Sequence, residues 1–447
     1  MIPERNVWEL SLADLAARIR TKEISVLEVA DCFLARIDAL DGELSAWVTV
    51  DPDRVRREAR KLDSAPSRGP LHGIPVGIKD IFATAGIKTT MGSPVFRNNV
   101  PDSDAGVVRR LKAAGALILG KTVTTEFATL DPGPTRNPWN PSHTPGGSSS
   151  GSGAAVASGM CPAATATQTV GSLGRPAAYC GITGILPTAS RVSLEGVFPV
   201  AKSLDHAGVF ARNLTDAMIV LDAMCPAPIS VSARSLRPTL GVVREYFQRE
   251  TEAAPWARHE RFIDDLRKAG VRVIDLSLPR SFDAALPAIW TIMQAEVAWV
   301  HERIYPEHKE AYGPEIRRLV EAGRKLYAFD YLRALEIRRT YQADMRQLFD
   351  SCDVILSPGA AGPAPRGLGS TGKPVLQAPW TLADFPTVSL PLDLTADGLP
   401  LGIQLSGPPL GEAGLFGAAR WIEEFMEGSG RIHPWSAPPT PSRSSGS

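Results

Sequence analysis

The sequence predicts an α/β protein. Short apolar segments with the pattern of buried strands alternate with helical segments along most of the 447 residues. Hydrophobic residues make up 44% of the chain, so a large core is possible. No polar linker separates two such cores. We place one domain at residues 1–435 and expect residues 436–447, which are rich in Pro and Ser, to form a disordered tail.

Composition excludes several classes of partner. Lys and Arg together number 48, as do Asp and Glu, so nothing in the charge balance favours nucleic acid or an anionic membrane surface. The N-terminus lacks a signal-peptide pattern, and no apolar stretch of about 18 residues predicts a membrane span. The five cysteines are scattered without a CxxC pair, which indicates reduced thiols in a cytoplasmic protein and disfavours a zinc site.

The N-terminal third reads as helices that flank short strands. The pattern predicts helices at 11–20 and 25–40, a strand at 46–50, a solvated helix at 54–61, a loop at 64–70, a helix at 104–114 and a buried strand at 116–121. Ser25 and Glu28 form a capping-box pattern at the start of the second helix. A turn-rich segment at 135–141 leads into the centre of the chain.

A Gly/Ser-rich stretch, Gly146 to Gly153 (GGSSSGSG), organises the centre. It could be a flexible linker, but a small, mostly apolar run follows from Ala154 to Ala166. That run fits a tightly packed buried helix, with Ser152 as its cap. A second Gly/Ser point lies at 169–172. Two serine loops joined by a buried element would fix serine side chains in place, as an active site needs.

The C-terminal half continues the alternation. A helix is expected at 212–225, strands at 238–243 and 271–278 around a helix at 252–269, then long helical segments and a last helix at 412–426. The helical segments carry aromatic residues, including Trp290, Trp299 and Tyr327. These residues, like Trp380 and Phe385 further on, could line an apolar pocket or belong to the core, and the core is favoured.

Two titratable residues stand out as candidates. Lys79 lies between Ile78 and Asp80 in an apolar segment, where it is either a functional residue or a lysine that snorkels from a strand edge. Of the seven histidines, none stands in a nucleophile-elbow context. His206 is the only histidine with a weak claim to a role in a pocket.

Three separated motifs resemble the amidase signature family. The chain reads GGSSSGS at 146–152, TQTVGS at 167–172 followed by PAAYCG at 176–181, and GIPVGIKD at 73–80. They stand in the family's order, and the 24-residue spacing between Ser148 and Ser172 is the family's spacing. Shorter matches recur at 203–205, 354–358, 384–391 and 398–407. The resemblance is strong over about 71–212, the signature core, and weak or absent across about 240–350.

The resemblance implies a fold and a set of site residues. The fold would be a single compact domain, with a mixed twisted β-sheet covered by helices on both faces. The site would be a Ser-Ser-Lys triad in which Ser172 is the nucleophile, Ser148 is the bridging serine after a cis peptide bond, and Lys79 is the base. Backbone N–H groups of Thr169, Val170, Gly171 and Ser172 would form the oxyanion hole. Ser149 would either support the triad or satisfy local backbone groups. No metal or organic cofactor is implied.

Lys79 can serve as a base only as a neutral amine. An ordinary lysine pKa is about 10.4, so at neutral pH the side chain is almost entirely protonated. Ile78, Ile81 and Phe82 would remove water from the ammonium and lower its pKa. Asp80 would have the opposite effect if it lay close, so we expect its side chain to point elsewhere.

The sequence departs from the commonest family pattern at three places. The family usually has Asp where Gln168 stands and Gly where Val170 stands, and it often reads S-x-R-x-P where this chain reads Ser172 to Pro176 as SLGRP. A TQT-type branch of the family shares these features. Because Gln is neutral, any charge role of an Asp at 168 is lost.

The resemblance predicts an amidase that hydrolyses a carboxamide C–N bond of a small molecule through a Ser172 acyl-enzyme. Alternatives of the same fold are an A-type component of an amidotransferase that works with partner subunits, an amide-forming acyltransferase, and a catalytically inactive binding protein. Intact Lys79, Ser148 and Ser172 disfavour the last. The substrate cannot be read, and a homodimer is one candidate for the oligomeric state.

Overall fold

The computed structural model describes residues 7–229 and 234–429, so the tail expected at 436–447 lies outside the described residues. Within these ranges, eleven strands form one sheet in the order β1-β3-β2-β4-β6-β5-β10-β11-β9-β7-β8. The strands are β1 (Trp47–Val50), β2 (Pro75–Lys79), β3 (Leu117–Thr122), β4 (Ala163–Gln168), β5 (Thr183–Leu186), β6 (His206–Ala211), β7 (Thr239–Val243), β8 (Arg272–Leu276), β9 (Val354–Pro358), β10 (Thr387–Leu394) and β11 (Pro400–Ser406).

The sheet is mixed, as expected. Strands β3, β2 and β4 run parallel, as do β9, β7 and β8 at the other end, and the strands between them pair antiparallel. Each parallel group needs crossover helices, which cover the faces of the sheet. One parallel group ends the sheet at β8, the other is followed by the antiparallel edge strand β1, and an antiparallel middle joins them.

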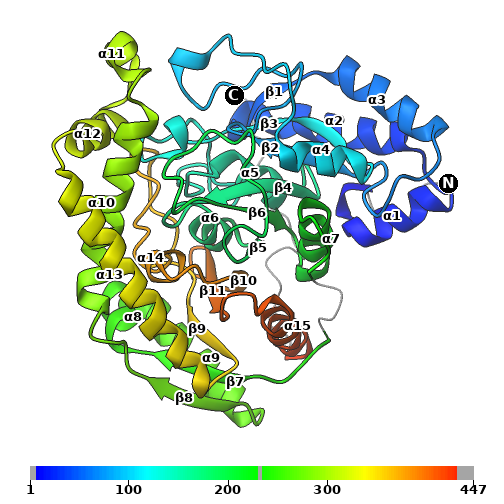
Figure 1. Ribbon diagram of the computed structural model, residues 1–447. Coiled ribbons are helices and arrows are strands. Elements are labelled where there is room, and N and C mark those ends of the chain that lie inside the picture. The colour runs from blue at the N-terminus through cyan, green and yellow to red at the C-terminus, as the bar shows by residue number, and fades with distance from the viewer. Residues whose placement is uncertain (1–6, 230–233, 430–447) are drawn as a thin grey trace, which may run out of the picture.

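Helices surround the sheet on both sides (Figure 1). The N-terminal helices are α1 (Leu12–Arg20), α2 (Val26–Leu44), α3 (Pro52–Ser64) and α4 (Gly106–Ala113). The central helices are α5 (Ser150–Ala157), α6 (Gly174–Cys180) and α7 (Leu214–Met224). The C-terminal helices are α8 (Glu245–Glu250), α9 (Ala253–Lys268), α10 (Phe282–Val300), α11 (Tyr305–His308), α12 (Pro314–Gly323), α13 (Ala328–Arg346), α14 (Ala378–Leu382) and α15 (Glu412–Gly428), and short 3₁₀ helices lie at Val7–Glu9, Pro94–Phe96, Glu126–Ala128, Lys309–Ala311 and Gln347–Asp350.

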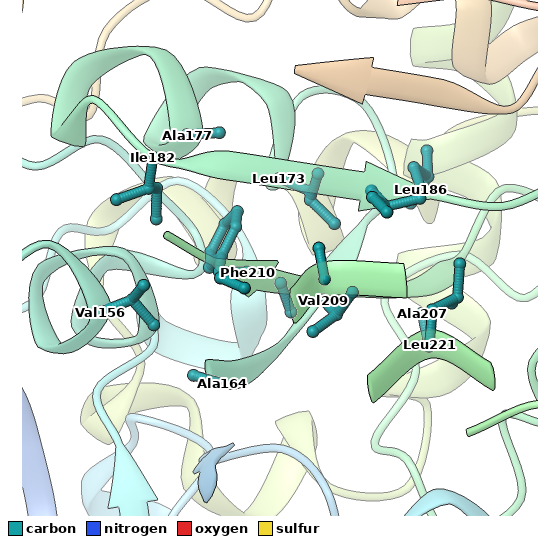
Figure 2. Close-up of a cluster of buried hydrophobic side chains, with 14 of the residues drawn as sticks. Val156, Ala164, Leu173, Ala177, Ile182, Leu186, Ala207, Val209, Phe210 and Leu221 are labelled. Atoms are coloured by element: carbon teal, nitrogen blue, oxygen red, sulfur yellow. The ribbon is translucent and has the colours of Figure 1, made fainter. Parts of the chain in front are cut away.

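A dry core underlies the centre of the sheet (Figure 2). Buried side chains from β4, β5 and β6 meet side chains from α5, α6 and α7: Val156, Ala164, Leu173, Ala177, Ile182, Leu186, Ala207, Val209, Phe210 and Leu221. Leu173 packs against the backbone of β5 at Gly184 and of β6 at Gly208. Because Leu173 directly follows Ser172, this packing anchors the second serine loop to the sheet.

One expectation about the centre was wrong. The run Ala154–Ala166 is not a single helix, because α5 ends at Ala157 and β4 begins at Ala163. Gly159 has a φ of 73°, which only glycine adopts readily, and Pro162 follows it, so the chain turns here. Ser152 lies inside α5 and not at its cap. From there its hydroxyl donates to Thr165 C=O at 2.8 Å.

Most of the other elements agree with the sequence. The capping box of Ser25 and Glu28 is present at the start of α2. The charge-rich run at 54–61 lies in α3, which Asp51 caps. Strands β7 and β8 pair in parallel with α9 between them in sequence, as the alternation predicted. No helix in the described residues is long and apolar enough to cross a membrane.

Candidate active site

Lys79 ends β2, and its amine lies among three hydroxyl groups. Nζ is 2.8 Å from Ser148 Oγ, 2.9 Å from Ser149 Oγ and 2.7 Å from Thr167 Oγ1. Thr167 lies on β4, which runs parallel to β2, so the carboxyl ends of the two strands bring these side chains together. The lysine side chain is fully buried and therefore does not snorkel to solvent.

Burial lowers the pKa of Lys79 well below its ordinary value, and the negative charge of Asp205 acts in the opposite direction. Among the described residues, Lys79 forms no ion pair that would hold its proton. A neutral amine donates two hydrogen bonds and accepts one, so three hydroxyl partners satisfy it. The site therefore accommodates Lys79 in the form that can accept a proton.

Asp80 turns away from Lys79, as expected. Its Oδ2 accepts from Thr90 N–H at 2.9 Å and from Thr90 Oγ1 at 2.5 Å. Asp80 instead acts on Lys121, a second buried lysine whose amine donates to Phe82 C=O and, at 3.0 Å, to Thr84 Oγ1. Burial lowers the pKa of Lys121 to about 7, and the charge of Asp80 opposes this shift.

Ser148 and Ser149 lie in the turn that precedes α5. The peptide bond between Gly147 and Ser148 is cis. Helix α5 packs directly on the strands, because a side chain at Gly151 would lie 2.2 Å from Ala46 C=O and 2.3 Å from Val123 N. The Ser149 hydroxyl contacts Lys79 and also pairs with Thr167 N–H and C=O at 3.3 Å, so its contacts fit both alternatives considered from the sequence.

Ser172 lies in the second serine loop, between β4 and α6. Ser149 N–H donates to Ser172 C=O at 3.4 Å, which joins the two loops. In the described part of the chain, Ser172 Oγ forms no hydrogen bond to Ser148 Oγ or to any other group. The proton path expected from Ser172 to Ser148 therefore has no hydrogen bond in this structure, and such bonds often form only when substrate binds.

The loop from Thr169 to Ser172 presents a row of backbone donors. None of its four N–H groups donates to another group in the described residues, although Thr169, Val170, Gly171 and Ser172 are all largely buried. Buried N–H groups are rarely left unpaired. The four N–H groups are therefore available to a ligand, as the oxyanion hole expected from the sequence requires.

A narrow cavity adjoins this loop. It leaves about 20 Å³ for the centre of a water molecule. It is lined by Ala128, Thr129, Leu130, Thr169, Val170, Gly171, Ser172, Arg175, Val200, Trp290, Met293, Leu319 and Pro374. Trp290 thus lines the cavity, whereas Trp380 and Phe385 belong to the core and Trp299 and Tyr327 are exposed. The cavity admits one water molecule, so a larger ligand requires its walls to move.

Arg175 lines the same cavity and was singled out in the sequence only as part of the SLGRP segment. Its guanidinium donates to Gly147 C=O at 2.5 Å, to Gly372 C=O at 2.9 Å and to Thr371 Oγ1 at 3.2 Å. Burial lowers the pKa of Arg175 to about 10. Arg175 therefore ties α6 to the turn before Ser148 and to the segment at 371–372.

Three further residues near the site carried no motif signal that singled them out. Thr167 contacts Lys79, and Asp205 accepts from Thr169 Oγ1 at 2.5 Å and from the N–H groups of Val200 and Ala201. Burial raises the pKa of Asp205 to about 6. Thr381 on α14 contacts Gln168 from more than 200 residues away in sequence. Thr167 belongs to the TQTVGS motif and Asp205 to the SLD segment, but neither was named as a site residue, and no motif contained Thr381.

His206 does not line the cavity. Its Nδ1 lies 2.7 Å from Leu204 C=O, and burial lowers the pKa of the ring, so the imidazole is neutral. The described residues contain no group of three or more His, Cys, Asp or Glu side chains that could hold a metal ion.

Comparisons with known proteins show the family to which the chain belongs. The model of the Amidase family matches residues 28–416. The A subunit of the glutamyl-tRNA(Gln) amidotransferase of Anaeromyxobacter sp. (strain K) is 36% identical, over 98% of this chain and 99% of that protein. A crystal structure of an amidase superposes with a TM-score of 0.86 at 30% identity, covering 93% of this chain and 99% of that one.

A third similar structure comes from a vestigial protein complex that reveals the evolutionary origins of an s-triazine catabolic enzyme. It superposes with a TM-score of 0.85 at 28% identity, covering 93% of this chain and 98% of that chain. The family match spans most of the chain and includes every residue of the site described above. The chain therefore belongs to the Amidase family, the amidase signature enzymes.

Proposed function

We propose that this protein is an amidase that hydrolyses a carboxamide C–N bond through an acyl-enzyme on Ser172. The observation that carries the proposal is the buried amine of Lys79, 2.8 Å from Ser148 Oγ and without a carboxylate partner in the described residues. Membership of the family establishes chemistry on amides, and the proposal adds hydrolysis, the triad and the nucleophile.

The first half-reaction uses the three side chains in sequence. Neutral Lys79 takes the proton of the Ser148 hydroxyl, and Ser148 takes the proton of Ser172. Ser172 Oγ attacks the amide carbonyl carbon, and the N–H groups of residues 169–172 stabilise the negative oxygen. The proton returns through Ser148 to the amide nitrogen, the C–N bond breaks, and ammonia or an amine leaves.

The second half-reaction releases the acid. Water attacks the acyl carbon of the Ser172 ester while its proton passes through Ser148 to Lys79. The Ser172–acyl bond breaks, Ser172 Oγ regains a proton, and the carboxylic acid departs. No step requires a metal or an organic cofactor. Apolar walls from Trp290, Met293 and Leu319 favour an apolar acyl group or leaving group near the scissile bond.

A component of an amidotransferase is the second candidate. It is favoured by the 36% identity to the A subunit of a glutamyl-tRNA(Gln) amidotransferase, which extends over nearly the full length of both chains. In that case Ser172 would form its acyl-enzyme from glutamine, and a partner protein would use the ammonia that is released. An amide-forming acyltransferase would use the same intermediate with an amine in place of water. Five cysteines without a disulfide suit the cytoplasmic location that we propose.

Ammonia release by the purified chain tests the proposal. The chain alone, with chelator present, is incubated with a panel of aliphatic, aryl and urea-type amides and with glutamine. We expect ammonia or amine release from at least one amide and none from the Ser172→Ala variant. Release only from glutamine, and only with a partner protein present, would replace the amidase by the amidotransferase component.

A further inference from the structure

We propose that Gln168 and Thr381 are positioning residues that aim the Gly171 N–H at the oxyanion. This inference rests on the proposed function, because it concerns the same loop. Gln168 ends β4 and Thr381 lies on α14, and both side chains are fully buried. Neither side chain lines the cavity, so any effect on the reaction must pass through the backbone of residues 169–172.

The orientation of the Gln168 amide is fixed by its neighbours. Oε1 accepts from Leu173 N–H at 3.1 Å and from Gly174 N–H at 3.0 Å. Both partners are backbone donors, so the oxygen must face them and the NH₂ group must face the other way. Nε2 then donates to Thr381 Oγ1 at 2.9 Å. Gln168 therefore holds the backbone at the end of the loop through Leu173 and Gly174, and Thr381 Oγ1 is the acceptor in its bond with Gln168.

The Thr381 hydroxyl passes this orientation to the loop. Because its oxygen accepts from Gln168, its hydrogen is free to donate, and Val170 C=O lies 3.1 Å away. Gln377 C=O, one turn earlier in the chain, is a longer alternative at 3.4 Å, so the shorter bond goes to Val170. A trans peptide is planar, with its C=O and N–H pointing in opposite directions. Holding Val170 C=O toward Thr381 therefore turns Gly171 N–H away from Thr381, and Gly171 lines the cavity.

The packing around Gly171 leaves this peptide little other support. A Cβ at residue 171 would lie 2.8 Å from Pro374 Cβ and 3.2 Å from Gln377 Oε1, so the position requires glycine because of close approach. Its φ is not in the left-handed region. Without a side chain, residue 171 cannot anchor its own peptide, and the hydrogen bond to Val170 C=O supplies that anchor.

Gln168 and Thr381 work as a pair. The Asp that the family commonly carries at this position has no N–H to donate, so as a carboxylate it would compete with Val170 C=O for the Thr381 hydrogen. The amide of Gln168 removes that competition. It donates to the Thr381 hydroxyl, which in turn donates to Val170 C=O. A charge is not needed for this role, which accounts for a neutral residue at 168.

Substitutions at Thr381 test the pair against a merely structural role. Thr381→Val keeps the shape and removes the hydroxyl, whereas Thr381→Ser keeps the hydroxyl. We expect Thr381→Val to lower kcat about 10- to 100-fold with KM nearly unchanged, because an interaction made only in the transition state is lost. Thr381→Ser should stay within about threefold of the parent protein.

Thr387→Val is a matched control. Thr387 is equally buried, and its hydroxyl has no hydrogen-bond partner in the described residues, so its removal should leave kcat unchanged. Gln168→Glu gives an independent test, because the carboxylate keeps Oε1 and loses the donor to Thr381. Its kcat should fall as in Thr381→Val, and the ratio of its kcat to that of the parent protein at the same pH should recover in part at low pH, where a protonated Glu can donate again.

Binding of a tetrahedral adduct separates positioning from folding. The probe is the boronic acid that corresponds to the acyl group of an amide the parent protein turns over. For Thr381→Val, we expect boronate affinity to fall by the same factor as kcat/KM, while affinity for the carboxylate product stays unchanged. Equal losses of both affinities, or activity equal to the parent protein, would overturn the inference. If the parent protein itself turns over no amide and acquires no Ser172 adduct, the proposed function fails instead.

Discussion

The signature core, residues 71–212, and the helical segment from β7 to the end of α13 contribute differently to the candidate site and the cavity beside it. The core supplies the hydroxyls and the amine around Lys79, and the loop 169–172 that lines the cavity. The segment supplies Trp290 and Met293 from α10 and Leu319 from α12 to the cavity wall. The polar groups thus come from contiguous motifs, whereas these three apolar wall residues come from helices that the motifs do not include.

The two regions are joined by carboxylates of the core. Asp131 accepts from Glu315 N–H at 3.0 Å and from Ile316 N–H at 2.7 Å, and Glu126 accepts from Gly313 N–H at 2.7 Å. These three N–H groups lie at the N-terminus of α12, whose N-cap residue Gly313 has no side chain to cap the helix. Negative charge at a helix N-terminus is stabilising, so the core fixes where this wall begins.

Loss of the base should have the largest effect. Lys79→Ala should lower kcat/KM by more than about 10⁴-fold, because proton transfer from Ser148 loses its acceptor. Lys79→Arg should not restore activity, because an arginine stays protonated. Steady-state kinetics measure both. As a control, Lys121→Met alters the other buried lysine of this region and should stay within about tenfold of the parent kcat. Near-normal turnover by Lys79→Arg would show that no neutral base is needed.

Substitutions in the apolar wall of the cavity should change the selectivity between amides more than the rate of the chemical step. Trp290→Ala enlarges the cavity and should raise kcat/KM for bulky amides relative to small ones by about 10- to 100-fold, while kcat for small amides changes little. The amide panel measures this ratio. A variant that lost kcat uniformly for all amides would place Trp290 in the chemical step and remove the distinction between the two regions.

The charge of Asp205 should affect the pH dependence of activity through the pKa of Lys79. Its carboxylate raises the pKa of Lys79, so Asp205→Asn should lower that pKa further. The neutral amine is the active form, hence kcat/KM should reach its plateau at lower pH in the variant than in the parent protein. Thr169→Val removes the hydroxyl whose hydrogen bond lowers the pKa of Asp205, so this variant should shift the profile in the same direction as Asp205→Asn and by a smaller amount. A profile that moved to higher pH would contradict the electrostatic link.

The smallest effect is expected at Asp131, the carboxylate of the signature core that caps the N-terminus of α12. Asp131→Ala removes two hydrogen bonds from the start of α12 and should cost about 1 kcal/mol of unfolding free energy. Denaturant unfolding measures this loss. Activity toward small amides should remain close to that of the parent protein, since Asp131 does not line the cavity. An abolished kcat in a folded variant would mean that α12 takes part in the chemical step.

What could be predicted from the sequence follows the same division. The contacts of Lys79 with Ser148 and Ser149 connect short motifs whose order and spacing are visible in the chain. The partnership of Gln168 with Thr381 was not predictable, because it joins residues 213 apart through the packing of α14. The split of the run 154–166 was missed because small apolar residues suit a buried helix and a buried strand alike, and the turn at Gly159 decides between them.

Labelling by a fluorophosphonate tests the central claim most directly. The probe forms a bond from a reactive serine Oγ to phosphorus and releases fluoride, and peptide mass spectrometry locates the adduct. We expect a single adduct on Ser172, formed faster as pH rises through the Lys79 ionisation, much slower in Lys79→Ala and Ser148→Ala, and absent in Ser172→Ala. An adduct on another serine with Ser172 unmodified, or equal labelling rates with and without Lys79, would contradict a Ser172 nucleophile activated through Ser148 by Lys79.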